Sequence, residues 1–245
     1  MNEQIKFGLV TPCLNSEKTI EKTIENVLKQ TYQNYKYVIV DGGSTDRTLD
    51  IIERYKILFG DKLTVISGPD RGIYDAMNKG IQCAGGDIVG IINSDDFYEV
   101  TALEKIKICY DSKARYQIIY GMMRKLDVEK NELAIVFYHH QNLNNQMICH
   151  PSAFVSYAIY RELGMYNLKY KIVSDYEFML RMVRNKDVKF IPVYNIIANF
   201  TSGGISGTYI GIQETNDVKY EFGIVSKKHY WLTKGKNILK HYVTN

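Results

Sequence analysis

The sequence predicts an α/β protein built on a mostly parallel sheet, and three observations predict it. Short apolar runs typical of buried strands alternate with segments whose apolar residues recur at helical spacing. Alternation of this kind is typical of βαβ units with right-handed crossovers. Polar clusters follow the ends of the expected strands, which is where ligands bind in such sheets. The chain has 245 residues, enough for one such domain with a substantial core.

Four apolar runs in the first hundred residues predict strands, and each run ends in a polar turn or loop. Three helices are expected between them. Asn15 or Ser16 is expected to cap the first helix, and the segment 44–46 (Ser-Thr-Asp) is expected to open the second. The expected strands are 7–11, 37–40, 63–67 and 87–92, and the third helix is 73–83.

The second half has a less regular pattern, which indicates a mixed region packed on the first half with no obvious linker. Beyond Gly204 the tail is expected to form a helix with an interrupted apolar face. The helices expected before it are 103–110, 157–163 and 174–183, and the strands are 117–122 and 133–138.

The positive charge gathers at the end of the chain. The net charge is only +4, but no acidic residue occurs from Ile224 to Asn245, where five lysines and the aromatic residues Tyr230, Trp231 and Tyr242 lie. Such a segment suits an anionic membrane surface, and a packed terminal helix is the alternative. We expect no nucleic-acid partner. The lysines are Lys227, Lys228, Lys234, Lys236 and Lys240.

Neither a signal peptide nor a membrane span is expected, because no apolar run approaches the roughly 18 residues that a span needs. The four cysteines lie far apart without metal-ligand spacing, which favours reduced thiols in a cytosolic protein. We therefore expect a cytoplasmic location, and any membrane contact is expected to be peripheral, on the cytoplasmic face.

Two adjacent carboxylates, Asp95 and Asp96, follow the fourth expected strand. Mg²⁺ and Mn²⁺ take oxygen ligands and keep water or phosphate as further partners. A diphosphate leaving group needs such a cation to absorb its developing charge. A divalent metal site is therefore one interpretation, and a strand-end turn with an Asp helix cap is the other.

Asp41 and Arg71 stand at two other strand ends. The Asp41 carboxylate can accept hydrogen bonds from a base or a ribose, whereas turn and cap chemistry is the alternative. The Arg71 guanidinium suits a phosphate, whereas a surface ion pair is the alternative.

Asp175 opens an expected helix in the segment VSDYEFMLR. A carboxylate there can act as a general base that takes the proton of an acceptor hydroxyl, or it can cap the helix. His150 precedes Pro151 and can line the same pocket, although a structural role is the alternative.

These motifs occur in a fixed order: TPCLN, VDGGSTD, GPDRGIYDAMNKGI, NSDD and SDYEFMLR. The ordered set, spanning roughly residues 5 to 200, resembles glycosyltransferase family 2, and in particular its branch for bacterial O-antigen, capsule or exopolysaccharide synthesis. The resemblance implies inverting enzymes with the GT-A fold, a Rossmann-like, mostly parallel sheet flanked by helices. It implies a donor half at 1–100, an acceptor and catalytic-base half at 101–205, and a basic aromatic tail at 206–245.

The resemblance also implies roles for single residues. Asp175 would be the catalytic base, His150 would contact the acceptor, and Asp95 and Asp96 would hold Mn²⁺ or Mg²⁺. The donor would be a UDP-sugar, with Asp41 reading the uracil edge, and the acceptor would be a glycan on a lipid diphosphate. The residues expected to bind the donor are Thr11, Pro12, Asn15, Asp41, Asp70, Arg71, Asn78, Asn93, Ser94 and Asp95.

Three departures from the family pattern refine these expectations. Asn93 replaces the first acid of the D-x-D motif, which keeps an oxygen ligand and loses a charge. Ser174 precedes Asp175 where the family has Glu, which leaves Asp175 as the candidate base. The Q-x-x-R-W motif of processive synthases is absent, so addition of a single sugar is expected.

Two other function classes share some of these features. A nucleotidyltransferase usually has a Gly-rich loop after its first strand, and the loop TPCLNSEKT contains no glycine. A nucleotide-sugar-binding domain without catalysis would not need Asp95, Asp96 and Asp175 together. A Rossmann dehydrogenase is not expected, because no G-x-G-x-x-G follows the first strand.

Overall fold

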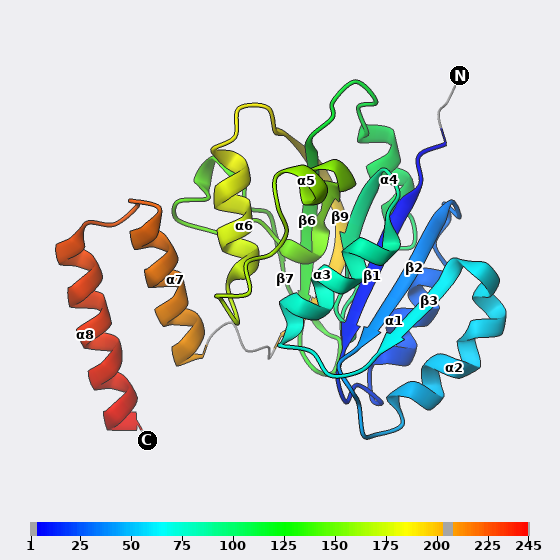
Figure 1. Cartoon of the computed structure of the whole chain (residues 1–245), viewed down its shortest axis with the longest axis horizontal. Helices are drawn as coiled ribbons and strands as arrows, with labels where there is room; N and C mark the ends of the chain where they lie inside the picture. Colours follow the sequence, from blue (N-terminus) through cyan, green and yellow to red (C-terminus); the bar gives the residue numbers. More distant parts are fainter. Residues whose placement is uncertain (1–3, 203–207, 245) are drawn as a thin grey trace.

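The computed structural model describes residues 4–202 and 208–244, except the side chains of residues 238–244. Within these ranges a nine-stranded sheet lies between two layers of helices (Figure 1). The strands are β1 Phe7–Cys13, β2 Tyr35–Asp41, β3 Leu63–Ser67, β4 Ile88–Ile91, β5 Phe97–Tyr98, β6 Gln117–Leu126, β7 Glu132–Val136, β8 Ala153–Ser156 and β9 Lys189–Thr201. The helices are α1 Ile20–Leu28, α2 Thr48–Phe59, α3 Ile73–Ala84, α4 Ala102–Cys109, α5 Tyr157–Glu162, α6 Ser174–Val183, α7 Tyr209–Glu221 and α8 Lys227–Thr244.

The strand order is β3-β2-β1-β4-β8-β6-β9-β5, with β7 paired to β6. The first four strands pair in parallel, as the alternating pattern of the first hundred residues predicts. Beyond β4 the sheet becomes mixed, because β8 is antiparallel to β4 and to β6 while β6 and β9 are parallel. The predicted α/β class and the mixed second half are therefore confirmed.

Side-chain alternation along the strands builds a core on each face of the sheet. Phe7 and Leu9 of β1 face α1, α2 and α4, whereas Val10 faces α3, α5 and α6. Gly80 brings α3 close to the sheet: a Cβ there would lie 2.3 Å from Cγ1 of Val10. This close packing holds α3 against the sheet, and the first residues of α3 line the cleft described below.

Two predicted helix starts are wrong, because both helices begin later in the chain than predicted. α1 begins at Ile20, and its cap makes no side-chain hydrogen bond. Asn15 instead accepts a hydrogen bond from the backbone N–H of Thr45 at 2.9 Å. α2 begins at Thr48 rather than near Ser44, and Oδ1 of Asp46 accepts the N–H of Thr48 at 3.0 Å.

Strand β9 was not predicted. It contains Pro192, Asn195 and Asn199, residue types that are depleted in strands. Its pairing with β6 is irregular between Gly121 and Met123, which accommodates part of this sequence. Tertiary pairing therefore overrides a weak local preference.

The tail forms two helices where one was predicted, and Gly223 (φ +65°) ends the first. The hairpin of α7 and α8 lies beside α6 (Figure 1). Val218 of α7 is fully buried in the core of the α6 face. Tyr230 of α8 stacks on Tyr220 with ring centroids 4.5 Å apart.

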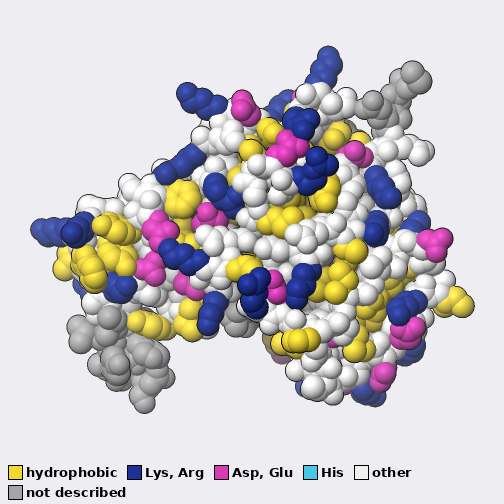
Figure 2. Space-filling view, in the orientation of Figure 1, with side chains coloured by type: hydrophobic (Ala, Val, Ile, Leu, Met, Phe, Trp, Pro, Cys, Tyr) yellow, Lys and Arg dark blue, Asp and Glu magenta, His cyan; other side chains and the backbone are white. Residues whose placement is uncertain are grey.

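Basic and hydrophobic side chains occur together at the outer end of this hairpin (Figure 2). Trp231 and Leu232 are exposed, and so are Lys227, Lys228 and Lys236. The side chains of Lys240 and Tyr242 lie outside the described part of the chain. No helix among the described residues is both long enough and apolar enough to cross a membrane.

Candidate active site

A cleft of about 990 Å³ opens at the carboxyl ends of β1 and β4, where ligands bind in parallel α/β sheets. Its walls come from the loops after these strands, from the start of α3, from residues 147–151 and from the start of α6. The two halves of the chain thus contribute to one cavity. Eight of the expected site residues line it: Pro12, Asn15, Asp70, Asn93, Ser94, Asp95, His150 and Asp175.

Five other expected residues do not line the cleft. One of them, Asp96, is described below, and the side chains of the other four bond within the protein. Thr11 is buried and accepts a hydrogen bond from the Tyr37 hydroxyl at 3.0 Å. Both ends of the Asn78 amide bond to the backbone of Tyr166. Arg71 is exposed and pairs with Asp75 at 3.1 Å. The fourth is Asp41.

The Asp41 carboxylate is fully buried at the end of β2. It accepts hydrogen bonds from the N–H of Gly43 at 3.1 Å and from the Ser67 hydroxyl at 2.8 Å. The Ser44 hydroxyl and N–H also donate to it. In this structure Asp41 therefore holds the turn that borders the cleft.

Two loops that line the cleft are joined directly. Asn15 has a left-handed backbone (φ +49°), which asparagine tolerates, and its N–H donates to the Ser44 hydroxyl at 2.8 Å. The hydroxyls of Ser16 and Ser94 lie 2.8 Å apart. The loop after β1 is thereby fixed against the Asn93–Asp96 segment.

Asp95 and Asp96 face different environments although they are adjacent. Asp95 is exposed in the cleft, whereas Asp96 is only 1% exposed and does not line it. Burial, and then the charge of Asp95, raise the pKa of Asp96 to about 8. Oδ1 of Asp96 accepts the N–H of Thr201 at 2.9 Å, which ties the motif to the end of β9.

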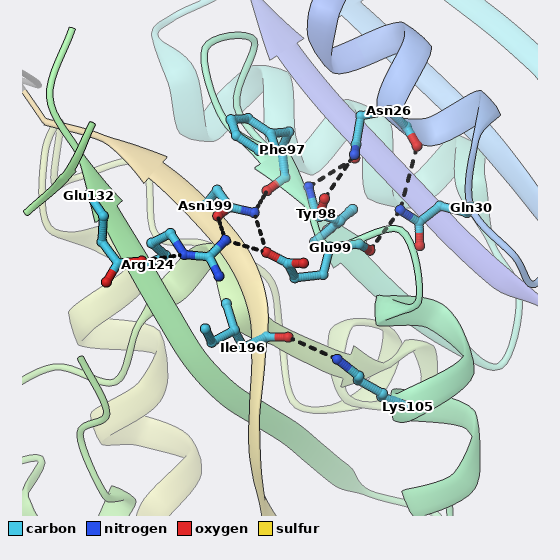
Figure 3. Close-up of polar contacts among 10 residues, drawn as sticks. All are labelled: Asn26, Gln30, Phe97, Tyr98, Glu99, Lys105, Arg124, Glu132, Ile196 and Asn199. Carbon is cyan, nitrogen blue, oxygen red and sulfur yellow. Dashed lines mark hydrogen bonds and ion pairs between the residues drawn. The ribbon is translucent and has the colours of Figure 1, made fainter. Parts of the chain in front are cut away.

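One face of α1 holds the backbone that follows this motif. The Thr23 hydroxyl donates to the carbonyl of Asp96 at 2.8 Å. The Asn26 amide pairs with both backbone groups of Tyr98, at 2.8 and 2.9 Å (Figure 3). Gln30, two residues beyond the end of α1, donates to the carbonyl of Glu99 at 3.0 Å. These side chains therefore hydrogen-bond the backbone groups of residues 96–99, as the backbone of a neighbouring strand would.

A second network joins the same segment to the rest of the sheet. Arg124 of β6 bonds Glu99 at 2.6 Å, Asn199 at 2.8 Å and Glu132 at 2.8 Å (Figure 3). These charge-assisted contacts link β5, β6, β7 and β9 on one side of the acidic motif. The backbone that carries Asp95 and Asp96 is thus held in place by contacts from several strands.

The acidic motif fits a divalent cation whose remaining ligands come from a substrate. Within the described ranges, no three His, Cys, Asp or Glu side chains form a complete metal cage. However, Oδ1 of Asn93 is buried without a hydrogen-bond partner among these residues, and the Asn93 amide lies 3.4 Å from Oδ2 of Asp96. Mg²⁺ is commonly held by one or two carboxylates plus substrate phosphates. Asn93, Asp95 and Asp96 supply such a set of oxygens.

Asp175 also lines the cleft, at the first turn of α6. Its Oδ1 accepts hydrogen bonds from the Tyr74 hydroxyl and from the N–H of Tyr176, both at 2.9 Å. The cap residue of α6 is Val173, which has no capping side chain. Burial, and then the charge of Asp175, raise the pKa of Tyr74 well above its ordinary value, so the phenol remains a hydrogen-bond donor.

His150 lines the cleft near Asp175 without contacting it. Its Nε2 lies 3.0 Å from the Tyr166 hydroxyl. Burial lowers the pKa of His150, so the imidazole is neutral at pH 7. A neutral ring here can donate or accept one hydrogen bond to a sugar hydroxyl without adding charge.

The cleft residues that sequence reasoning missed include three with polar side chains, Tyr74, Lys125 and Lys171. Tyr74 follows Gly72 by two residues, and its position at the start of an expected helix beside the GPDRG loop was the available signal. Lys125 lies beyond residue 122, where its strand was expected to end. Lys171 stands in a loop for which the sequence shows no regular pattern.

Comparison with known proteins identifies the family to which this chain is similar. The chain matches the model of the family described as Glycosyl transferase family 2 over residues 9–189. A PGL/p-HBAD biosynthesis glycosyltransferase of Mycobacterium bovis is 28% identical over 208 residues, 83% of this chain and 80% of that protein. Chondroitin synthase of Escherichia coli is 28% identical over 182 residues, 71% of this chain and 26% of that protein.

A structural neighbour is S. aureus TarS 1-349, solved in complex with UDP-GlcNAc. It superimposes with a TM-score of 0.71 at 17% identity, over 98% of this chain and 73% of that chain. The shared architecture is the GT-A fold. Since the family model covers well over half of its length, the chain belongs to glycosyltransferase family 2.

Proposed function

We propose that this glycosyltransferase moves one sugar from a UDP-sugar to a hydroxyl of a glycan acceptor, with inversion at the anomeric carbon. One observation carries the proposal: the acidic motif at the end of β4 and the Asp175 carboxylate line the same cleft. A donor held at the motif therefore shares a cavity with a base for the acceptor.

The donor side consists of the loops after β1 and β4 and the loop before α3. Pro12, Asn15, Asp70 and Ser94 would contact the donor, because they line this part of the cleft. Thr11 and Asp41 are buried and would hold these loops in position without contacting the donor. The fold likeness to TarS, whose solved complex contains UDP-GlcNAc, supports the choice of a UDP-sugar.

Asn93, Asp95 and Asp96 would hold Mn²⁺ or Mg²⁺, which supplies positive charge for the diphosphate leaving group. Burial and the charge of Asp95 raise the pKa of Asp96, and a bound cation would lower it again by stabilising the ionised carboxylate.

Asp175 would take the proton of the acceptor hydroxyl as its oxygen attacks the anomeric carbon. The new C–O bond forms while the bond from that carbon to the diphosphate oxygen breaks, so UDP leaves and the configuration inverts. The Tyr74 hydroxyl holds the Asp175 carboxylate in place, at 2.9 Å. Such a base contributes about 10²- to 10⁴-fold to the rate.

The acceptor side is formed by residues 147–151 and the start of α6. His150 would contact the acceptor glycan. The similarity to chondroitin synthase supports a polysaccharide product. A lipid-linked acceptor is supported by the exposed Trp231 and Leu232 among lysines of α8, which suit an anionic membrane surface.

A transfer assay with UDP-sugars, a divalent metal and a panel of glycan acceptors tests this function. We expect metal-dependent transfer, an inverted anomeric centre by NMR, and a kcat lower by about 10²-fold or more in Asp175→Asn. Nucleotide affinity should be unchanged in this variant. Retention of configuration, or full activity of Asp175→Asn, would remove the proposed mechanism.

A further inference from the structure

A single carboxylate from the C-terminal hairpin holds the loop that leads into Asp175. Glu214 of α7 accepts three consecutive backbone N–H groups. Its Oε1 accepts that of Lys171 at 2.9 Å, and its Oε2 accepts those of Ile172 at 2.8 Å and Val173 at 3.3 Å. Lys171, Ile172 and Asp175 all line the cleft, so this contact lies directly behind its wall.

The same loop is held from the opposite side by α3. The Tyr74 hydroxyl is 2.7 Å from the carbonyl of Ile172 and 2.9 Å from Asp175. The Ser174 hydroxyl closes the loop by donating to the carbonyl of Asn167 at 2.9 Å. The backbone of Ile172, three residues before Asp175, is therefore fixed by one side chain from each of two distant helices.

A carboxylate suits this position for two physical reasons. Hydrogen bonds from N–H groups to an ionised acceptor are stronger than those between neutral groups. The three N–H groups also precede the first turn of α6, where the helix dipole favours a negative charge. No lysine or arginine in the described part of the chain forms an ion pair with Glu214, so its charge serves the loop alone.

The helix that carries Glu214 is itself firmly placed. Val218, one turn further along, is fully buried in the core, and the carbonyl of Phe222 at the end of α7 accepts a hydrogen bond from Arg184 of the main domain. Asp217, also on α7, bonds to α8 instead of to this loop: it accepts the Tyr230 hydroxyl at 2.8 Å. Helix α7 thus joins the hairpin to the wall of the cleft.

From these contacts we infer that Glu214 is a positioning residue for the catalytic base, so that the C-terminal hairpin is part of the active-site frame. The inference rests on the proposed function, because it takes Asp175 as that base. Substitution of Glu214 should lower kcat and leave donor binding intact, since its three hydrogen bonds go to residues 171–173 and not to the loops proposed to contact the donor. A misplacement of about 1 Å costs on the order of 100-fold in rate.

The test compares Glu214→Gln and Glu214→Ala with Asp217→Asn in the full chain. Asp217→Asn is the matched control: it weakens the contact of α7 with α8 and leaves the loop contacts unchanged. Hydrogen exchange of the peptide over residues 167–175 reports whether Glu214 holds this loop, without any assay of activity. Fluorescence of Trp231, the single tryptophan, reports whether the hairpin stays docked.

We expect faster exchange in residues 171–173 and a kcat reduced tenfold or more in Glu214→Ala, with a smaller loss in Glu214→Gln, which keeps one acceptor oxygen. UDP affinity should change less than twofold, and Asp217→Asn should show neither effect. Unchanged exchange in Glu214→Ala, or faster exchange with unchanged kcat, would overturn the inference. An equal loss of kcat in Asp217→Asn would also overturn it. A wild-type protein inactive with every donor would refute the proposed function instead. Hydrogen exchange would still decide whether Glu214 holds residues 171–173.

Discussion

Asp175 depends on a partner far away in the sequence. Its carboxylate accepts the hydroxyl of Tyr74, which is 101 residues distant and comes from the other half of the fold. The same hydroxyl reaches the carbonyl of Ile172. One phenol therefore orients both the base and the loop that precedes it.

Replacing Tyr74 by Phe removes this hydroxyl and leaves the ring in the core. The lost contacts are worth about 1–2 kcal/mol, so we expect kcat to fall roughly tenfold with little change in nucleotide affinity. Steady-state kinetics and UDP titration measure both effects. Tyr160→Phe is the control, because Tyr160 is buried on α5 and does not line the cleft. Equal effects of the two substitutions would contradict a specific role for Tyr74.

Burial of His150 also makes stability depend on pH. Because its pKa is lowered in the folded state, the unfolded chain binds more protons as the pH falls below about 6.5. The stability that the neutral ring contributes is therefore complete above this pH and is lost on acidification. His140 has a lowered pKa as well, from burial, and adds to the loss.

Asp96, whose pKa is raised to about 8, acts in the opposite sense, because in this pH range the folded state holds a proton that the unfolded carboxyl has lost. The prediction is therefore a difference between variants. On acidification from pH 7.5 to pH 5.5, the free energy of unfolding should change more favourably in His150→Gln than in the wild type. Urea unfolding at both pH values measures this. The exposed His229 provides the control, and its substitution should leave the pH dependence as in the wild type. A pH dependence unchanged in His150→Gln would show that this ring does not carry the effect.

The sequence predicts chemistry that is local in the chain better than chemistry that the fold assembles. Asp95 and Asp175 stand out because each follows or opens a regular element. Tyr74 and Glu214 act through loop residues about 100 and about 40 positions away, so no spacing in the sequence reveals their partners. The buried state of Asp41 likewise depends on Ser67, which reaches it only through the pairing of β2 with β3.

At the scale of elements, α1 and the short strand β5 form a unit that supports the acidic motif. Thr23 and Asn26 lie on one face of the helix, and Gln30 follows its last residue by two positions. The three side chains bond the backbone from Asp96 to Glu99. The position of the motif therefore depends on the polar side of α1 as well as on the strand before it.

Substitution of Asn26 by Ala removes both hydrogen bonds to Tyr98. With each bond worth about 1 kcal/mol, we expect the free energy of unfolding to fall by about 1–3 kcal/mol. Nucleotide affinity in the presence of Mn²⁺ should fall as well, because the motif loses its support. Lys22→Ala, on the exposed side of the same helix, should change neither quantity. Lost stability with unchanged nucleotide affinity would show that nucleotide binding does not depend on the contacts of α1 with the acidic motif.

Elements of the first half were predictable because each strand is an apolar run between polar turns. The second half was harder for a physical reason. Strand β8 has only four residues, and β9 contains Pro192 and two asparagines that the pairing with β6 compensates. The break between α7 and α8 falls at Gly223, whose φ is positive. The prediction of a single helix in the tail overlooked this glycine.

At the scale of the whole molecule, the hairpin brings a basic and hydrophobic surface to the side of the domain that carries the base (Figure 1). Tyr230 and Lys234 face inward, where both contact Asp217. Trp231 and Leu232 remain exposed on the outer side with Lys227 and Lys228. Attachment through this face would place the acceptor wall of the cleft near lipid.

Sedimentation with vesicles tests this surface. We expect binding to vesicles containing phosphatidylglycerol, weaker binding to pure phosphatidylcholine, and loss of binding in Trp231→Ala/Leu232→Ala. The matched control is Ile57→Ala/Leu58→Ala, which removes an exposed apolar pair of α2. Equal binding by both double variants would show that α8 is not the attachment site.

The central claim is a metal-dependent UDP-sugar site at the carboxyl ends of β1 and β4. Calorimetric titration with UDP, GDP and dTDP, in Mn²⁺ and in EDTA, tests it most directly when repeated on Asp95→Ala, which changes an exposed cleft residue without disturbing the core. We predict that UDP binds best, that EDTA abolishes binding, and that Asp95→Ala weakens it tenfold or more. Absence of UDP binding to folded protein, or binding unaffected by EDTA and by the substitution, would contradict the claim.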